Sequence, residues 1–173
     1  MREVVTEPRL RTFMRAIAAE AREPGRIYFT GGACAVLQHW RESTLDIDIT
    51  ILPESDCILR TIPGLKELLH VNVELASPAD FVPPLPGWET RSPFIALEGP
   101  ISFHHYDFYS QALSKLERSH RKDLLDVSAM IRDGLVDPER LKALFEEVED
   151  LLYRYPAVDP RSLRAAVERL PRL

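Results

Sequence analysis

Two aspartates separated by a single residue are the strongest chemical feature of the sequence. Asp46 and Asp48 begin the run Asp46–Leu52 (DIDITIL), in which polar residues alternate with apolar ones. Side chains two positions apart on a strand point to the same face, so these carboxylates would lie about 6.5–7 Å apart along the backbone. Neighbouring carboxylates repel each other unless a cation lies between them, and Mg²⁺ or Mn²⁺ accepts oxygen ligands. The spacing therefore predicts a divalent metal site.

A pair of glycines precedes this strand. Gly31 and Gly32 stand between the stretch Arg26–Phe29, which predicts a short strand, and an apolar stretch to about Trp40, which predicts a helix. Backbone N–H groups at such a turn can face an anion, so the pair is a candidate phosphate seat. The segment between positions 32 and 46 is long enough for one short helix and a turn, which would bring the two strands side by side. We therefore expect the phosphate seat and the acidic pair to open into one cavity.

Taken singly, these signals are weak, because a Gly-Gly pair also marks ordinary loops and a D-x-D run also marks a solvated strand face. Arg41, Ser43 and Thr44 complete an order of strand, glycine pair, helix, polar connection and acidic strand. Phosphoryl and nucleotidyl transfer need a positioned triphosphate and metal ions that neutralise its developing charge. The combined pattern favours such a transfer over a purely structural role.

The stretch from Thr30-Gly31-Gly32 through Asp46-Ile47-Asp48 resembles the signature of the DNA polymerase β-type nucleotidyltransferase superfamily, especially its minimal nucleotidyltransferases and the AbiEii-type toxin enzymes. Those proteins pair a Gly-Gly or Gly-Ser turn with a D-x-D strand. The resemblance implies a small mixed β-sheet flanked by helices, two metal-binding carboxylates and a third carboxylate on a neighbouring strand. It also implies that the nucleotide is bound by residues of the turn and of the connection after it: Gly31, Gly32, Arg41, Ser43 and Thr44.

The third carboxylate has two candidates. Glu74 lies on the alternating stretch Val71–Leu75, which predicts a strand, and it shares a face with Asn72. There it would be the third metal ligand and could also act as the base. The family more often has aspartate at this point, so Asp80 in the following segment stays an alternative, as does an exposed strand glutamate without a role.

A second charged block follows in the region predicted to be helical. Lys115, Arg118, Lys122, Asp123 and Asp126 recur at helical spacing, which by itself indicates a surface ladder of salt bridges. AbiEii-type enzymes carry a lysine motif followed by a Lys-Asp pair and a further Asp, and this block matches that layout. The resemblance implies that Lys115 binds the β- or γ-phosphate, that Lys122 or Arg118 supports it, and that Asp123 holds the cations or assists proton transfer.

The elements predict an α+β fold in two parts, an αβ nucleotidyltransferase core over residues 1–105 and a helical C-terminal part over residues 106–173. In the core we expect a helix from Pro8 to about Arg22, a helix from Glu54 to Leu69 interrupted at Pro63-Gly64, and a hairpin or pair of edge strands at Phe94–Leu97 and Ile101–His105. The proline-rich segment from Ser77 to Pro93 predicts a stiff loop without regular helix. From Asp107 onward four helices are expected, with breaks near Ser119, Asp133-Gly134 and Pro156 and with proline starts at Pro138 and Pro160.

Two further groups invite a functional interpretation. The adjacent His104 and His105 point to opposite faces of a strand and would not easily chelate one ion, although either could line a nucleotide pocket. Phe81 and Trp88 could clamp a base by stacking, but packing against the core is the simpler expectation. Cys34 and Cys57 lack the clustered spacing of a zinc site or disulfide framework.

Composition limits the classes of partner. The 173 residues carry a formal net charge of −5, so any contact with nucleic acid is expected to be local and not spread over a basic surface. No apolar run has the length of about 20 residues needed to span a membrane. The charged N-terminal stretch lacks the apolar core of a secretory signal, so we expect a cytoplasmic protein without a membrane partner.

The leading hypothesis is an enzyme that transfers a nucleotidyl group from a nucleoside triphosphate (NTP) to an acceptor hydroxyl and releases pyrophosphate. The resemblance implies tRNA or protein as acceptor, a role as the toxin of a toxin-antitoxin system, and an antitoxin partner; nothing in the sequence specifies the NTP or the oligomeric state. The alternative is a catalytically weak module that binds a nucleotide or a partner on the same fold. A metal-dependent phosphohydrolase using the same carboxylates is a third hypothesis.

Overall fold

The computed structural model describes residues 3–171, and the chain divides into two compact units. Unit 1 is the chain through Ser77 together with Pro93–His105, and unit 2 is Pro78–Ser92 together with the chain from Tyr106 onward. The chain therefore crosses between the units after Ser77, after Ser92 and after His105. Within residues 3–171, no helix combines the length and apolar character required to cross a bilayer.

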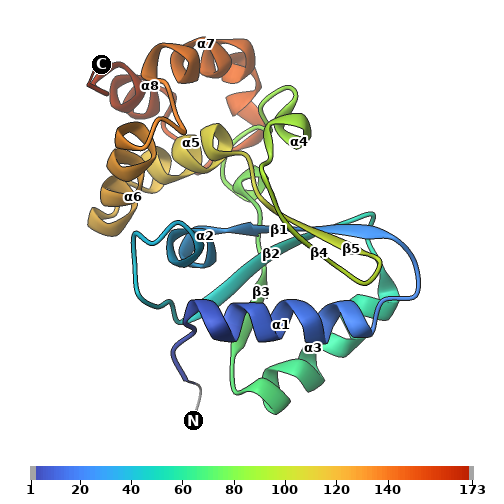
Figure 1. Ribbon diagram of the computed structural model, residues 1–173. Helices are drawn as coiled ribbons and strands as arrows, with labels where there is room; N and C mark the ends of the chain where they lie inside the picture. Colours follow the sequence, from blue (N-terminus) through green and yellow to red (C-terminus); the bar gives the residue numbers. More distant parts are fainter. Residues whose placement is uncertain (1–2, 172–173) are drawn as a thin grey trace. The chain divides into compact units, whose positions relative to one another are not determined.

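Unit 1 is built on a five-stranded mixed sheet with the strand order β3-β2-β1-β5-β4 (Figure 1). β1 runs antiparallel to β2 and parallel to β5, β2 runs parallel to β3, and β4 and β5 form an antiparallel hairpin. The predicted hairpin is confirmed, but of its two strands only β4 is an edge strand of the sheet, because β5 lies between β1 and β4. The strands are β1 (Gly25–Thr30), β2 (Asp46–Leu52), β3 (Asn72–Leu75), β4 (Phe94–Glu98) and β5 (Ile101–His105).

One face of this sheet carries the hydrophobic core of unit 1. The isoleucines of β2 are buried in that core, whereas the polar residues that alternate with them are only half-buried. The apolar faces of α1 (Glu7–Ala19) and α3 (Asp56–Leu69) complete the core on the same side. Because side chains alternate along a strand, burying the isoleucines fixes the polar residues of β2 on the other face.

The short helix α2 (Gly31–Leu37) follows β1 directly, without an intervening loop. The sequence predicted a helix to about Trp40, but α2 ends at Leu37 and His39 adopts a left-handed backbone conformation (φ 59°). The connection from α2 to β2 is tied to the N-terminal segment by a bridge between Val5 and Thr44. This bridge fixes the chain just before β2 begins.

The predicted interruption at Pro63-Gly64 is wrong, because α3 runs through both residues. Pro63 lies on the exposed side of the helix, while Ile58, Ile62 and Leu65 pack into the core of unit 1. A proline inside a helix removes one hydrogen bond and crowds the preceding turn, at about 3 kcal/mol. Burial of three branched apolar side chains, at about 1.5–3 kcal/mol each, outweighs that penalty.

Unit 2 contains the four predicted helices, which are α5 (Phe108–Arg118), α6 (Arg121–Arg132), α7 (Pro138–Val148) and α8 (Pro160–Glu168). The expected proline starts are confirmed: Asp137 and Asp159 accept backbone N–H bonds at the beginnings of α7 and α8. The breaks are confirmed as well, since Ser119 and Gly134 both adopt left-handed conformations. α5 is buried along most of its length and is the central helix of this unit. The α+β fold with a small mixed sheet and a C-terminal helical bundle is therefore confirmed.

The proline-rich segment is not entirely free of helix. It contains a 3-10 turn, η1 (Pro78–Asp80), and a single α-helical turn, α4 (Trp88–Arg91), and it belongs to unit 2. The ring of Trp88 stacks on Tyr106 with a centroid separation of 4.1 Å. The Arg91 guanidinium donates two hydrogen bonds to the carboxylate of Asp107, which also caps α5. Packing against its own unit is therefore the observed use of Trp88.

Candidate functional site

Asp46 and Asp48 lie on β2 with their side chains on the face opposite the core of unit 1. Ile47 and Ile49, which alternate with them, have no exposed surface and anchor the strand. Asp48 is in register with Thr30, the last residue of β1, and with Glu74 on β3. Since β2 has a hydrogen-bonded neighbour on each side, the direction of both carboxylates is set by the sheet.

The glycine turn lies directly against the acidic strand. A Cβ atom placed on Gly31 would be 2.6 Å from Oδ2 of Asp48, closer than real Cβ contacts, and Gly31 has a left-handed backbone (φ 58°). The backbone conformation favours glycine, and a side chain at this position would displace the Asp48 carboxylate. The backbone of the turn therefore lies next to the carboxylate of Asp48, which is the adjacency that a common site for phosphate and metal requires.

Gly32 makes an equally close approach to the connection before β2. The space that a Cβ on Gly32 would take is filled by the side chain of Thr44. The Thr44 hydroxyl donates to the backbone carbonyl of Asp46 at 3.2 Å. Thr44 thus joins the glycine turn to the start of the acidic strand. Arg41 and Ser43, the other two predicted nucleotide contacts, lie on the same connection and are half-buried.

Glu74 is brought beside the acidic pair by the parallel pairing of β2 and β3. The link is Asn72, whose side-chain amide donates to Asp46 Oδ1 at 2.7 Å and to Glu74 Oε1 at 2.9 Å. Asn72 is mostly buried and pairs with Asp46 in the sheet register. The sequence showed that Asn72 and Glu74 share a face, but gave Asn72 no function. The only sequence pattern that could have identified Asn72 is N-x-E on β3 opposite D-x-D on β2, and it appears only once the two strands are paired.

This set of side chains fits a hard divalent cation by its chemistry. Asp46, Asp48 and Glu74 supply carboxylate oxygens, which are the ligands Mg²⁺ prefers. Gly31 has no side chain, so only its backbone lies next to the Asp48 carboxylate. In the part of the chain that the structure describes, no three His, Cys, Asp or Glu side chains are already assembled as a metal cluster. The amide of Asn72 occupies one oxygen each of Asp46 and Glu74. Each of these carboxylates has a second oxygen that could bind a cation, so metal binding is compatible with the bonds to Asn72.

Asp80, the alternative third carboxylate, is not on the sheet that carries Asp48 and Glu74. It ends the 3-10 turn η1 and belongs to unit 2, whereas Asp48 and Glu74 face the same side of the sheet of unit 1. Register alone brings Glu74 next to Asp48. This arrangement favours Glu74 over Asp80 as the partner of the acidic pair.

The charged block of unit 2 forms a buried cluster between α5 and α6. The Lys115 ammonium donates to Asp123 Oδ1 at 3.1 Å and to Asp126 Oδ2 at 2.7 Å, and Arg118 donates to Asp123 Oδ1 at 2.8 Å. Less than a tenth of Lys115, Asp123 or Asp126 is exposed, so an exposed salt-bridge ladder is wrong for these three. Two cations and two carboxylates compensate each other here, which makes removal of any one partner costly.

The functions predicted for this block stay predictions. Lys115 has three N–H donors, and two of them are used by the carboxylates of α6. Arg118 is partly exposed, and its guanidinium lies 5.2 Å from the centre of the Phe81 ring. Lys122 is exposed on the first turn of α6. Of the five charged residues of the block, Arg118 and Lys122 are the ones with exposed side chains, and the Arg118 guanidinium lies over the Phe81 ring.

The two adjacent histidines face different surroundings, as predicted. The His104 ring lies tilted against Tyr28 and meets Phe94 edge-on, with ring centroids 5.4 and 5.7 Å away. His105 is buried beside α2, where its ring contacts Cys34 and Gln38. Burial, followed by the charges of Arg11 and His104, lowers the pKa of His105 from 6.5 to about 4. His105 is therefore neutral at physiological pH.

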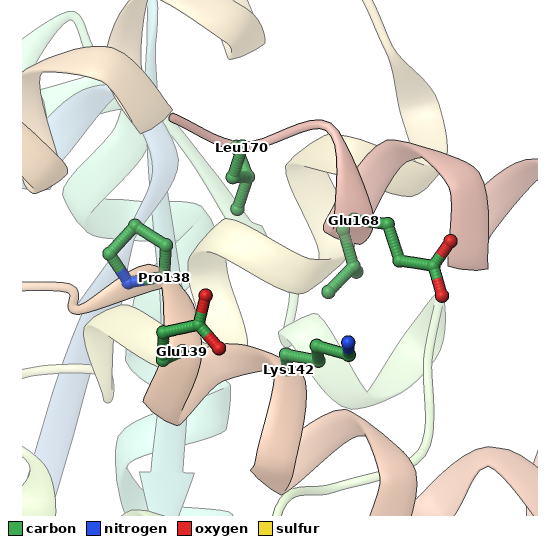
Figure 2. A pocket seen from close by; sticks show the side chains of 6 residues that line it. Pro138, Glu139, Lys142, Glu168 and Leu170 are labelled. Atoms are coloured by element: carbon green, nitrogen blue, oxygen red, sulfur yellow. The ribbon is translucent and has the colours of Figure 1, made fainter. Parts of the chain in front are cut away.

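Within residues 3–171, the structure has a surface pocket in each unit. One, of about 220 Å³, lies between α7 and α8; Figure 2 shows Glu139, Lys142 and Glu168 around it, with Pro138 and Leu170. The other, of about 290 Å³, lies in unit 1 at the opposite end of β1 and β2 from the glycine turn, where Gly25 and Pro53 line it with Cys57. Neither lining includes a residue predicted to bind metal or nucleotide.

Comparison with known proteins identifies a family. The comparisons with curated proteins and with solved structures found no match. A family profile described as a nucleotidyltransferase of unknown function matches residues 9–167, a span that includes the glycine turn, the acidic strand and the charged block of unit 2. Because that match covers most of the sequence, the chain belongs to this nucleotidyltransferase family (DUF6036).

Proposed function

We propose that the protein is a metal-dependent enzyme that transfers a nucleotidyl group from an NTP to an acceptor hydroxyl, with release of pyrophosphate. The observation that carries the proposal is the contact between the Gly31 backbone and the Asp48 carboxylate, with Glu74 in register beside them. A triphosphate seat and metal-binding oxygens must be adjacent for this reaction. The family to which the chain belongs supports the same reaction class.

Each group in unit 1 has a distinct task in this proposal. Asp46 and Asp48 hold Mg²⁺ or Mn²⁺, and the backbone N–H groups of Gly31 and Gly32 face the phosphates. A bound divalent ion would neutralise charge that develops on the transferred phosphoryl group. Glu74 is either the third metal ligand or the base that takes the proton from the acceptor hydroxyl. The hydroxyl oxygen then attacks the α-phosphorus, and the bond from that phosphorus to pyrophosphate breaks.

The residues of the connection and of unit 2 extend the proposal. Arg41, Ser43 and Thr44 would contact the nucleotide, since they lie on the segment that packs on the glycine turn. Arg118 and Lys122 would support a phosphate through their exposed surfaces. A phosphate bond from Lys115 would use its third N–H donor, with Asp123 holding the ammonium in place.

The acceptor is the least constrained part of the proposal. The likeness to AbiEii-type enzymes supports tRNA or protein as acceptor and the role of a toxin with an antitoxin partner. Expression of the protein in a host cell should then arrest growth, and Asp48→Asn should relieve the arrest. Growth arrest that persists in Asp48→Asn would rule out a toxin that acts through this site.

Incubation with NTPs labelled at the α-phosphate, Mg²⁺ or Mn²⁺ and cell extract tests the reaction itself. We expect label on a macromolecule, and we expect no label when the γ-phosphate carries it, because that phosphate leaves with pyrophosphate. Asp48→Asn should abolish labelling. Asp56→Asn is the matched control, because it makes the same change of carboxylate to amide at an exposed aspartate at the start of α3.

A binding module without catalysis is the second candidate, and one contact favours it. The amide of Asn72 bonds one oxygen each of Asp46 and Glu74, so fewer carboxylate oxygens are left for metal ions. A binding module would retain NTP affinity, measured by calorimetry, without transferring label. Release of free phosphate in place of macromolecular labelling would point instead to a phosphohydrolase.

A further inference from the structure

A buried chain of hydrogen bonds connects α2 to the two central strands of unit 1. The Cys34 thiol donates to the backbone carbonyl of Phe29 at 3.0 Å, and its sulfur lies 3.1 Å from Nδ1 of His105. The other ring nitrogen of His105 lies 3.0 Å from Nε2 of Gln38. Cys34 lies in α2 and Gln38 is the C-cap residue directly after it, so one imidazole contacts both the helix and its C-terminal end.

The direction of each bond follows from the chemistry of its atoms. Because the Cys34 hydrogen goes to the Phe29 carbonyl, the sulfur accepts from Nδ1–H of His105. The amide nitrogen of Gln38 is only a donor, so Nε2 of His105 must accept from it. The neutral ring with its proton on Nδ1 satisfies both bonds. A positively charged ring would have no acceptor left for Gln38.

α2 needs such anchors because its own sequence supports a helix weakly. It has only seven residues and begins with two glycines, which have no side chains to bury against neighbouring elements. Isolated helices shorter than about 12 residues are marginal in water. The position of α2 must therefore be set by its buried residues, which are Ala33, Cys34, Ala35 and Val36, and by the bonds to His105.

The same helix begins with the glycine turn. Gly31 follows β1 directly and lies against Asp48, so any shift of α2 moves the turn relative to that carboxylate. Misplacement of a contact group by about 1 Å can lower activity by about a hundredfold. His105 lies on the core side of the sheet, whereas Asp48 points to the other face, so His105 acts on the turn only through α2.

We propose that His105 is a positioning residue that holds α2, and with it the Gly31-Gly32 turn, in place against Asp48 through its bonds to Cys34 and Gln38. The effect on the turn stands by itself, whereas the effect on nucleotide affinity rests on the proposed function. In that function the turn contacts phosphates that are bound in both ground state and transition state. Loss of His105 should therefore raise KM for the NTP more than it lowers kcat.

The test compares His105→Phe, His105→Asn and wild type by the amide NMR signals of Gly31 and Gly32 and by steady-state kinetics. Phenylalanine fills the space without hydrogen bonds, while the asparagine amide can still donate to Cys34. We expect shifted and faster-exchanging glycine amides in His105→Phe, with KM raised about tenfold to a hundredfold and kcat changed less. His105→Asn should restore part of both effects.

His70→Asn is the matched control, because His70 ends α3 in a left-handed conformation (φ 52°) that asparagine also adopts. It should leave the glycine amides and KM as in wild type. If His105→Phe does not fold, Gln38→Leu removes one bond of the chain from a half-buried position and is expected to give the same changes in smaller size.

The outcomes separate this proposal from the proposed function. Glycine amides that coincide with those of wild type in folded His105→Phe, or in Gln38→Leu where the first variant does not fold, would overturn the positioning role even if wild type transfers nucleotides. Shifted amides in a protein that neither binds nor transfers NTP would support the positioning role and refute the function. A fall in kcat with unchanged KM would also overturn the proposal as stated.

Discussion

Gly31 and Asp48 lie so close that a side chain at position 31 would collide with the Asp48 carboxylate. A Cβ on Gly31 would be 2.6 Å from the Asp48 carboxylate, and the residue has φ of 58°. Gly31→Ala should therefore strain the backbone and push the turn or the carboxylate away. Left-handed backbone disfavours alanine by about 1–2 kcal/mol, and we expect a loss of stability of about that size together with at least a tenfold loss of transfer activity.

Gly64→Ala is the control for this prediction. Gly64 lies within α3, and a Cβ there would meet nothing within 4 Å. Alanine should stabilise this helix by about 0.5–1 kcal/mol and leave activity unchanged. Denaturant unfolding and the labelling assay measure both variants. Normal activity in a folded Gly31→Ala protein would show that the close approach to Asp48 has no catalytic importance.

The fold was predictable where side-chain alternation carries it. Asp46–Leu52 is a strand over its whole predicted length, because each isoleucine is buried and each intervening polar residue is not. Treating Pro63-Gly64 as a helix breaker gave a wrong interruption in α3, where Pro63 is tolerated on an exposed face while Ile62 and Leu65 pack inward. Local propensity cannot show which side of a helix will be buried by distant strands.

The candidate site was predictable in its local parts and not in its long-range parts. The glycine turn and the acidic strand are visible as motifs, and their adjacency follows from the β1–β2 pairing. The amide of Asn72 between Asp46 and Glu74 depends on β2–β3 register, and the bond between Cys34 and His105 joins residues 71 positions apart. Neither contact has a local sequence signal.

Substitution of the two candidate third carboxylates separates their functions. Glu74 faces the same side of the sheet as Asp48 and pairs with it in register, whereas Asp80 lies in unit 2. We expect Glu74→Gln to reduce transfer by about a hundredfold or more, as loss of a base or metal ligand does, and Asp80→Asn to have little effect. Single-turnover labelling at saturating Mg²⁺ measures both. The reverse order of effects would assign the third carboxylate to Asp80.

Removal of the buried ammonium of Lys115 should destabilise the helical unit. Lys115→Met keeps the shape of the side chain but removes the ammonium that bonds Asp126 and Asp123, while Asp123 keeps Arg118. Breaking a buried ion pair from one side lowers the free energy of unfolding by about 3–5 kcal/mol. Replacing both members, as in Lys115→Met with Asp126→Leu, should recover much of that loss. Urea unfolding of the two variants checks this, and equal losses would show that the charges are not coupled.

Protonation of His105 should make stability depend on pH in a defined window. Its pKa is about 4 in the folded protein and 6.5 in the unfolded chain, so the unfolded chain binds the proton first as the pH falls. The free energy of unfolding should then decrease from about pH 6.5 down to about pH 4, by about 3 kcal/mol in total, and this component should be constant above and below that window. Because asparagine does not titrate, His105→Asn should lack this pH-dependent component. The difference in the free energy of unfolding between wild type and His105→Asn should therefore be largest at neutral pH and shrink on acidification. Urea unfolding at half-unit pH steps measures both curves; parallel curves would mean that the imidazole is not kept neutral by its burial beside α2.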